Sequence, residues 1–136
     1  MKRIFSLLPA ILIALLLTSS IVSAHHSFAM FDAEKTITLT GTVKELEWTN
    51  PHSWLRIMVE DAATHKTLQW SIELASVGQQ ARIGWNPTIV KPGDKVAVEI
   101  NPLRDGARGG TLLLITLPDG TKLGHGGQRG NPRGDN

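Results

Sequence analysis

The feature that most constrains the fold is a period-two alternation of apolar and polar residues, which recurs in five short segments after residue 35. Such alternation is typical of β-strands that bury one face of a sheet. The five segments cover residues 36–48, 53–60, 67–74, 96–100 and 111–117. Because the first three follow one another through short connections, we expect them to pair as a meander.

The first segment changes the phase of its alternation part of the way along. Ile37, Leu39 and Val43 alternate with threonines, whereas Leu46 and Trp48 have the opposite parity. A change of phase within one strand indicates a β-bulge or a sharp bend. A bent first strand can serve both edges of a closed sheet, and that arrangement is found in the five-stranded OB-type barrel.

A short helix is expected between the third and the fourth strand. Ser76 and Gln79 have the spacing of a capping box, and Gly84 suits the end of a helix. Residues 77–83 would then form about two turns. The predicted fold class is therefore all-β, a small five-stranded OB-like barrel with one short helix between strands 3 and 4. A small open β-sandwich is the alternative.

The N-terminus has the three parts of a secretory signal peptide. Lys2 and Arg3 precede a mostly apolar run, and Val22-Ser23-Ala24 supplies a small-residue cleavage site. An uncleaved membrane anchor is the competing interpretation, because a spanning helix needs roughly 20 apolar residues. Pro9, the polar residues 18–20 and the small residues at the end of the run favour cleavage after Ala24.

The expected protein is therefore periplasmic or secreted, with no membrane span after cleavage. From Gly124 onward the chain contains only glycine, proline, polar and charged residues, which cannot bury enough apolar surface to order a segment. The predicted organisation is a signal peptide over residues 1–24, an N-terminal lead-in over 25–35, the barrel domain over 36–123 and a disordered glycine-rich tail over 124–136.

Composition limits the partners and the chemistry of the mature chain. Cleavage would remove 24 of the 136 residues and leave 112, which suits one domain. The chain has 14 Lys and Arg against 12 Asp and Glu, so loss of Lys2 and Arg3 leaves 12 of each. A net charge of zero disfavours nucleic acid as a partner, because phosphate binding depends on positive charge. Without cysteine, a metal site would use nitrogen and oxygen ligands.

Several short motifs resemble one known family. They are HHSFAMFD at residues 25–32, WTNPHSWL at 48–55, GWNP at 84–87 and KPGD at 91–94. Together they resemble a group of small exported bacterial proteins known only as a domain of unknown function. The resemblance implies export and a single small β-domain, and it supplies no catalytic residues. Function must therefore be argued from the site itself.

The adjacent histidines at the predicted cleavage site suggest a metal chelate. After cleavage, His25 would carry a free amine beside its own imidazole and that of His26. Amine and imidazole nitrogens suit copper, nickel or zinc, and copper leads because Cu²⁺ stands at the top of the divalent affinity series. The plainer interpretation is that two exposed histidines at a chain end bind metal only weakly.

His52 is the natural third ligand, because it follows Pro51 in a turn and a rigid position suits a preorganised site. Its imidazole could instead cap the turn or pack against a tryptophan. His65 cannot share an ion with His52, since the second strand between them spans ~26 Å at ~3.3 Å per residue. His125 lies in the predicted tail and is not counted among the ligands. The predicted function is thus an exported, non-catalytic binding protein that takes copper through His25, His26 and His52.

A module that binds a neutral small ligand, an oligosaccharide or a periplasmic partner protein is the alternative function, because OB-type barrels bind ligands through loops at one end. Trp54 lies opposite the core parity of its strand, and the loop expected near the Asn-Pro-His turn contributes Arg104, Asp105 and Arg108. An enzyme is disfavoured because the chain has no cysteine, no tyrosine and no serine motif of catalytic type. A copper oxygenase with an N-terminal histidine brace is the remaining enzymatic alternative.

Overall fold

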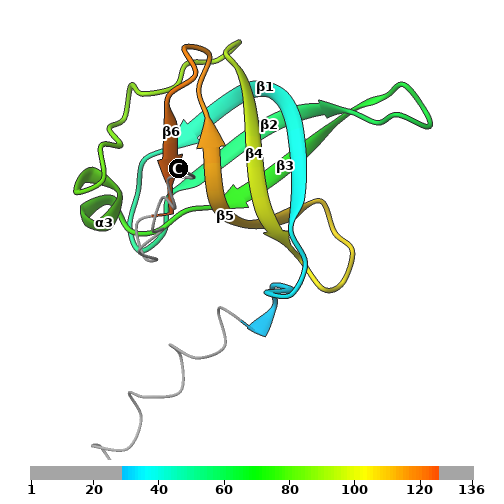
Figure 1. Ribbon diagram of the computed structural model, residues 1–136, viewed down its shortest axis with the longest axis horizontal. Helices are drawn as coiled ribbons and strands as arrows, with labels where there is room; N and C mark the ends of the chain where they lie inside the picture. Colours follow the sequence, from blue (N-terminus) through cyan, green and yellow to red (C-terminus); the bar gives the residue numbers. More distant parts are fainter. Residues whose placement is uncertain (1–28, 126–136) are drawn as a thin grey trace, which may run out of the picture. The chain divides into compact units, whose positions relative to one another are not determined.

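The computed structural model describes residues 29–125, and the segment from Phe31 onward belongs to one compact unit. Within these residues the chain forms one six-stranded sheet and a short helix, α3 (Val77–Ala81) (Figure 1). The strands are β1 (Ile37–Glu47), β2 (Trp54–Glu60), β3 (Thr67–Glu73), β4 (Lys95–Pro102), β5 (Gly109–Thr116) and β6 (Lys122–Gly124).

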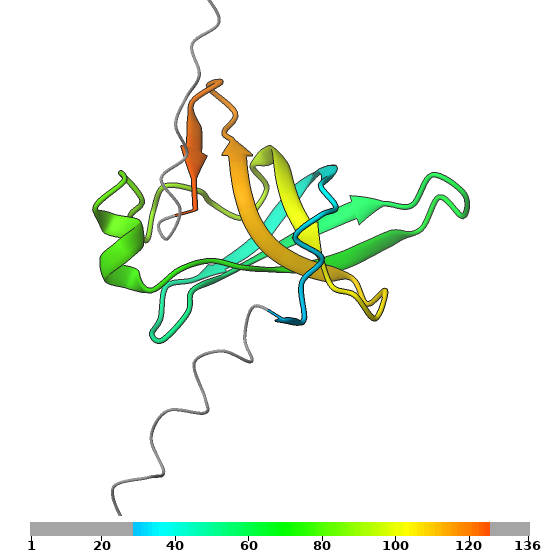
Figure 2. The same ribbon diagram turned by 60° about the horizontal axis from the view of Figure 1, so that its bottom comes forward.

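The sheet closes on itself as the OB-type barrel that the sequence predicted. The strand order is β3-β2-β1-β4-β5-β6, and a parallel pairing of β3 with β5 joins the two ends of the five-stranded part. Figure 2 shows β4 and β5 crossing over the β1–β2–β3 part of the sheet. Strand β6 adds a short hairpin arm to β5. The ends of the five predicted strands lie within two residues of the observed ends.

The bend in β1 allows one strand to serve two neighbours. Its first half pairs with β4 and its second half with β2. The register against β2 shifts between Val43 and Glu45, so Lys44 is the extra residue of a bulge. This confirms the phase change predicted from the alternation. Gly41 lies at the bend, where a Cβ atom would come within 2.6 Å of the Met58 carbonyl oxygen.

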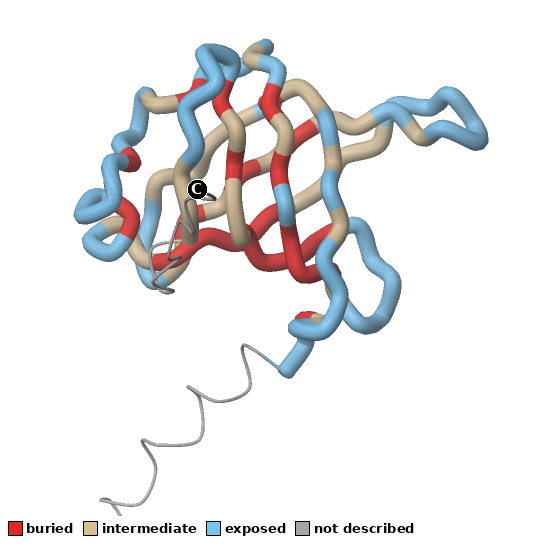
Figure 3. Tube along the Cα trace, viewed as in Figure 1, coloured by how far each residue is buried: buried red, intermediate tan, exposed pale blue. Residues whose placement is uncertain are grey.

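The core fills the inside of the barrel. Buried positions alternate with more exposed ones along β2 and the first part of β4, whereas the ends of β3 and β4 and the start of β5 are buried continuously (Figure 3). Trp85, which follows α3, is buried and belongs to the core. Trp48 and Trp70 are partly buried and pack against that core. Trp54 has the opposite parity and lies on the outer face, as predicted. The buried core consists of Val43, Leu55, Ile57, Ile72, Leu74, Trp85, Val90, Val96, Val98, Ile100, Leu112, Ile115 and Leu117.

Helix α3 begins with the predicted capping box. The Ser76 hydroxyl oxygen accepts a hydrogen bond from the Gln79 N–H, and the Gln79 side chain accepts one from the Ser76 N–H. The helix ends at Ala81, two residues earlier than predicted. The chain turns away there because the Trp85 N–H donates back to the Gln80 carbonyl, and Gly84 adopts a positive φ of 99°.

The ordered chain extends further than the sequence indicated. The predicted tail began at Gly124, but Gly124 is the last residue of β6 and pairs with Leu114 of β5. The His125 N–H also donates to the Leu113 carbonyl at 3.2 Å. The prediction failed because it counted apolar side chains, whereas backbone pairing with β5 requires none. The Trp85 indole N–H also donates to the Gly124 carbonyl at 3.2 Å.

The predicted signal peptide, the two histidines at positions 25 and 26 and most of the predicted tail lie outside the described residues. Across residues 29–125, the structure contains no helix that is both long and apolar enough to cross a membrane.

Candidate functional site

The turn between β1 and β2 is fixed firmly against the end of β3. It contains a cis peptide bond between Asn50 and Pro51. The Ser53 N–H donates to the Ala75 carbonyl at 3.2 Å, and the Leu74 N–H donates to the Ser53 carbonyl at 2.9 Å. The Asn50 side-chain oxygen also accepts from the first N–H of α3, that of Val77, at 3.2 Å. His52 therefore projects from a rigid segment, as its place after Pro51 predicted.

The imidazole of His52 faces a buried carboxylate. Its Nδ1 lies 2.5 Å from Glu73 Oε1, and the Glu73 side chain is only 9% exposed. Burial raises the pKa of Glu73, and the charge on His52 opposes that rise. Because Nδ1 is engaged, Nε2 is the ring nitrogen of His52 that can meet another partner. Glu73 is the last residue of β3, opposite Trp54 in β2 and beside Thr111 in β5.

A second imidazole, that of His125, belongs to the same end of the barrel. Thr111 pairs with Glu73, and Leu113, which holds the backbone of His125, lies two residues further along β5. Burial lowers the pKa of His125, and the charge on His52 lowers it further. The buried Nδ1 of His125 has no hydrogen-bond partner among residues 29–125.

Two imidazoles and one carboxylate thus belong to the same end of the barrel, and we call these three residues the His52–Glu73–His125 cluster. In the part of the chain that the structure describes, no three His, Asp or Glu side chains are arranged as a ready-made metal-binding group. The cluster is therefore a pair of candidate nitrogen ligands with a carboxylate that orients one of them. Of the three predicted metal ligands, only His52 can be placed, because His25 and His26 lie outside the described residues.

His65 lies at the other end of β2, as the strand length predicted. Its side chain is exposed, and its Nδ1 lies 3.1 Å from Glu60 Oε1. The seven residues of β2 separate it from His52 by about 23 Å at ~3.3 Å each. His65 therefore belongs to a different part of the surface and provides a natural control for the behaviour of His52.

Sequence reasoning missed both Glu73 and His125. The alternation in β3 places Glu73 on the outer face, where a carboxylate is normally solvated, but the β1–β2 turn and β5 cover that end of the strand. For His125 a usable signal existed. A hairpin turn at residues 118–120 implies that the residues just after Leu123 run back along β5.

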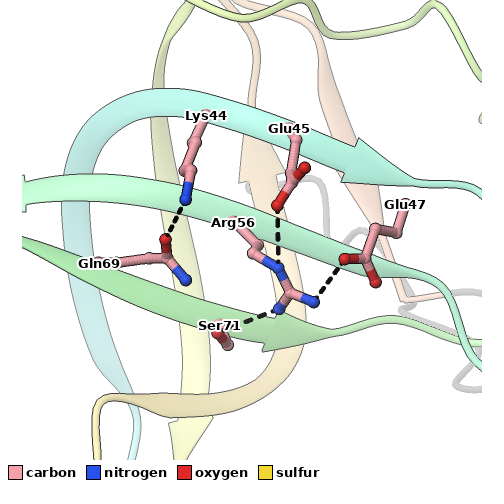
Figure 4. Close-up of polar contacts among 6 residues, drawn as sticks. All are labelled: Lys44, Glu45, Glu47, Arg56, Gln69 and Ser71. Atoms are coloured by element: carbon pink, nitrogen blue, oxygen red, sulfur yellow. Dashed lines mark hydrogen bonds and ion pairs between the residues drawn. The ribbon is translucent and has the colours of Figure 1, made fainter.

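The outer face of β1, β2 and β3 carries balanced charge. Figure 4 shows the polar side chains that cover it, which are Lys44, Glu45, Glu47, Arg56, Gln69 and Ser71. Arg56 donates to Glu45 at 3.1 Å and to Glu47 at 2.6 Å, so two carboxylates surround one guanidinium. The Lys44 ammonium donates to the Gln69 amide oxygen at 2.7 Å.

The loop that contains Arg104, Asp105 and Arg108 does not lie beside the Asn-Pro-His turn. Parallel pairing of β3 with β5 places it next to Ser71, whose N–H donates to the Arg108 carbonyl at 3.2 Å. Arg104 lies 3.5 Å from Asp32, and Asp105 accepts from the Ala107 N–H within the loop.

Arg108 lines a pocket of about 330 Å³ with Asp61 and Trp70, at the end of β2 that is remote from Trp54. Trp54 and Arg108 were predicted to belong to a single ligand surface, but the structure places them at opposite ends of β2. Trp54 instead lies near the His52–Glu73–His125 cluster, since it pairs with Glu73 across the strands.

A small OB-type barrel with a histidine–glutamate cluster at its β1–β2 turn is the class of protein that this fold and site define. The chain belongs to a family of unknown function (DUF6152), whose model matches residues 14–112. The matched region contains His25, His26, His52 and Glu73, and it ends before His125. No curated protein and no solved structure matches the chain significantly.

Proposed function

We propose that this protein is exported, does not catalyse a reaction, and binds copper or a similar transition ion through imidazole nitrogens. The observation that carries the proposal is the pairing of His52 with Glu73, which occupies Nδ1 and leaves Nε2 as the coordinating atom. A carboxylate that holds the second ring nitrogen is the usual outer-shell partner of a metal-binding histidine.

The predicted mature terminus supplies the other imidazoles. Cleavage after Ala24 exposes the amine of His25, and an α-amine with a pKa near ~7.7–8.0 is partly neutral at the pH of the periplasm. The amine, the ring of His25 and the ring of His26 then form a nitrogen chelate for which Cu²⁺ has the highest affinity among the common divalent ions.

A binding role fits the surroundings of His52 better than a catalytic one. Ser53 is the adjacent hydroxyl, but it is buried, and its hydroxyl donates to the Thr49 carbonyl at 3.2 Å. A nucleophile needs a general base within hydrogen-bond reach, and the ring nitrogen of His52 nearest the backbone is already turned toward Glu73. The neighbouring serine and histidine therefore do not form a catalytic pair.

Isothermal titration of the mature protein with Cu²⁺ tests the proposal. We expect a tight binding step that disappears when His25 and His26 are both replaced by serine, because the terminal chelate then has no imidazole. His52→Ala should weaken copper binding, whereas His65→Ala should leave it unchanged, since that exposed ring lies at the far end of β2. Unchanged affinity in the His25→Ser/His26→Ser variant would remove the support for the terminal chelate.

The pocket beside Arg108 favours a second candidate function, the binding of a neutral small ligand, an oligosaccharide or a periplasmic partner protein. Its lining combines charged side chains with apolar ones, and its volume falls within the range of small-molecule sites. The larger apolar side chains in the lining are Leu39, Val59, Leu68 and Trp70. A glycan array should then give a signal that Arg108→Ala abolishes and that the exposed control Arg82→Ala retains.

A further inference from the structure

We propose that the barrel carries a transition-metal site of its own, in which Nε2 of His52 and Nδ1 of His125 bind the ion while Glu73 orients His52 from outside the coordination sphere. The site goes beyond the proposed function in two respects. It needs no free amino terminus, and it recruits a histidine from the C-terminal arm of the barrel.

Three backbone segments that are distant in sequence converge at this site. The β1–β2 turn is hydrogen-bonded to the end of β3 through Ser53 and Leu74, and β3 pairs there with β5 through Glu73 and Thr111. Two residues, or about 7 Å, further along β5, the Leu113 carbonyl holds the backbone of His125. The topology therefore brings the two histidines to one edge of the barrel, although 73 positions separate 52 from 125.

Both histidines are held in position by contacts that do not involve their rings. The turn before His52 is anchored to α3 through Asn50, and the residue before His125 is anchored by the Trp85 indole N–H. Because Trp85 is itself buried in the core, its hydrogen bond ties the C-terminal arm to the core. Fixed positions of this kind reduce the reorganisation that a metal site would otherwise require.

The polar groups of the cluster are better satisfied with an ion than without one. Nδ1 of His125 is buried and has no hydrogen-bond partner among residues 29–125, which is an unfavourable state for a ring nitrogen. The Glu73 carboxylate is buried as well, and its ion-pair partner among residues 29–125 is the single imidazole of His52. A divalent cation between the rings would give the free nitrogen a partner and place positive charge near the carboxylate.

The ligand set indicates the class of metal. Two imidazole nitrogens suit zinc, copper or nickel, whereas calcium and magnesium prefer oxygen ligands. Two protein ligands leave coordination positions open for water or for a ligand from another molecule. A site that is incomplete in this way can pass an ion to a partner, which is the chemistry that a metal-handling protein requires.

The test uses the mature chain with His25→Ser and His26→Ser, so that no terminal imidazole contributes. Zn²⁺ is added, and the ring nitrogens of the three remaining histidines are followed by NMR. We expect the Nε2 signal of His52 and the Nδ1 signal of His125 to shift together, and the His65 signals to stay in place. If Zn²⁺ moves neither His52 nor His125, the proposal is overturned, whatever the terminal chelate does in the native sequence.

Variants in the same background separate coordination from structure. His125→Ala should abolish Zn²⁺ binding, while Glu73→Gln should weaken it about 10–100-fold, as expected for loss of an orienting group. His65→Ala is the matched control and should bind Zn²⁺ like its parent. Amide spectra of the metal-free variants check that each barrel is folded, and undiminished affinity in a folded His125→Ala variant would exclude His125 as a ligand.

Discussion

Gly41 offers the sharpest test of how the barrel closes. Strand β1 bends there against β2, and the Cβ of an alanine would lie 2.6 Å from the Met58 carbonyl oxygen and 3.0 Å from Cγ2 of Val59. The carbonyl belongs to the β2 backbone, so it cannot rotate away as the end of a side chain would. Overpacking of this kind costs ~1–3 kcal/mol. Alanine also lowers the conformational entropy of the unfolded chain, which stabilises the protein by ~0.4–1 kcal/mol. The net destabilisation expected for Gly41→Ala is therefore about 1–2 kcal/mol.

Gly78 is the matched control, because it is a glycine with no atom within 4 Å of an added Cβ. It lies inside α3, where alanine is more favourable than glycine by up to ~1 kcal/mol. Gly78→Ala should therefore stabilise the protein slightly, and the same chemical change at the two positions should have opposite signs.

Thermal and urea unfolding, followed by tryptophan fluorescence, measure both effects. For a domain of this size, 1 kcal/mol corresponds to a shift of ~4–8 °C in Tm. Gly41→Ala should accordingly lower the Tm by roughly 4–16 °C, and Gly78→Ala should raise it by at most ~8 °C. If Gly41→Ala were as stable as the native chain, the close approach of β1 to β2 could not be the reason for glycine at this position.

Three further predictions concern the helix cap and the C-terminal arm. Ser76→Ala removes the acceptor of the capping box and should cost about 1 kcal/mol, measured by the urea midpoint. Burial lowers the pKa of His125, so the unfolded metal-free chain takes up a proton first as pH falls below ~6.5. The free energy of unfolding should therefore fall as the pH is lowered from ~6.5 to the lowered pKa of His125, and the His125→Gln variant should lack this loss. The raised pKa of Glu73 makes the free energy of unfolding rise as the pH is lowered, and it does so equally in the native chain and in the variant. Trp85→Phe deletes the hydrogen bond to the Gly124 carbonyl and should speed amide exchange of His125, while an unchanged exchange rate would show that this bond does not hold the arm.

Local patterns were sufficient to predict most of the barrel. The period-two alternation identified the five long strands, and the phase change between Val43 and Leu46 indicated the bulge at Lys44. The capping box at Ser76 located the start of α3. Each of these features depends on residues that are close in sequence, so each leaves a mark that a single sequence can reveal.

The candidate site could be predicted only in part, because it depends on which strand ends meet in space. His52 was identifiable from its place after Pro51, but its partner Glu73 was not, since strand parity gives the face of a residue and not what covers it. The loop with Arg108 was expected near the turn and lies instead near Asp61. The error over the loop originates in the parallel pairing of β3 with β5, which no local pattern reveals.

The measurement that tests the central claim most directly is native mass spectrometry of the protein recovered from the periplasm of cells that export it. The mass should correspond to a chain that begins at His25 with a copper ion bound, and denaturation should release that ion. A chain that retains its leader, begins at another residue, or carries no metal after growth with copper would contradict the account of copper binding at the mature terminus.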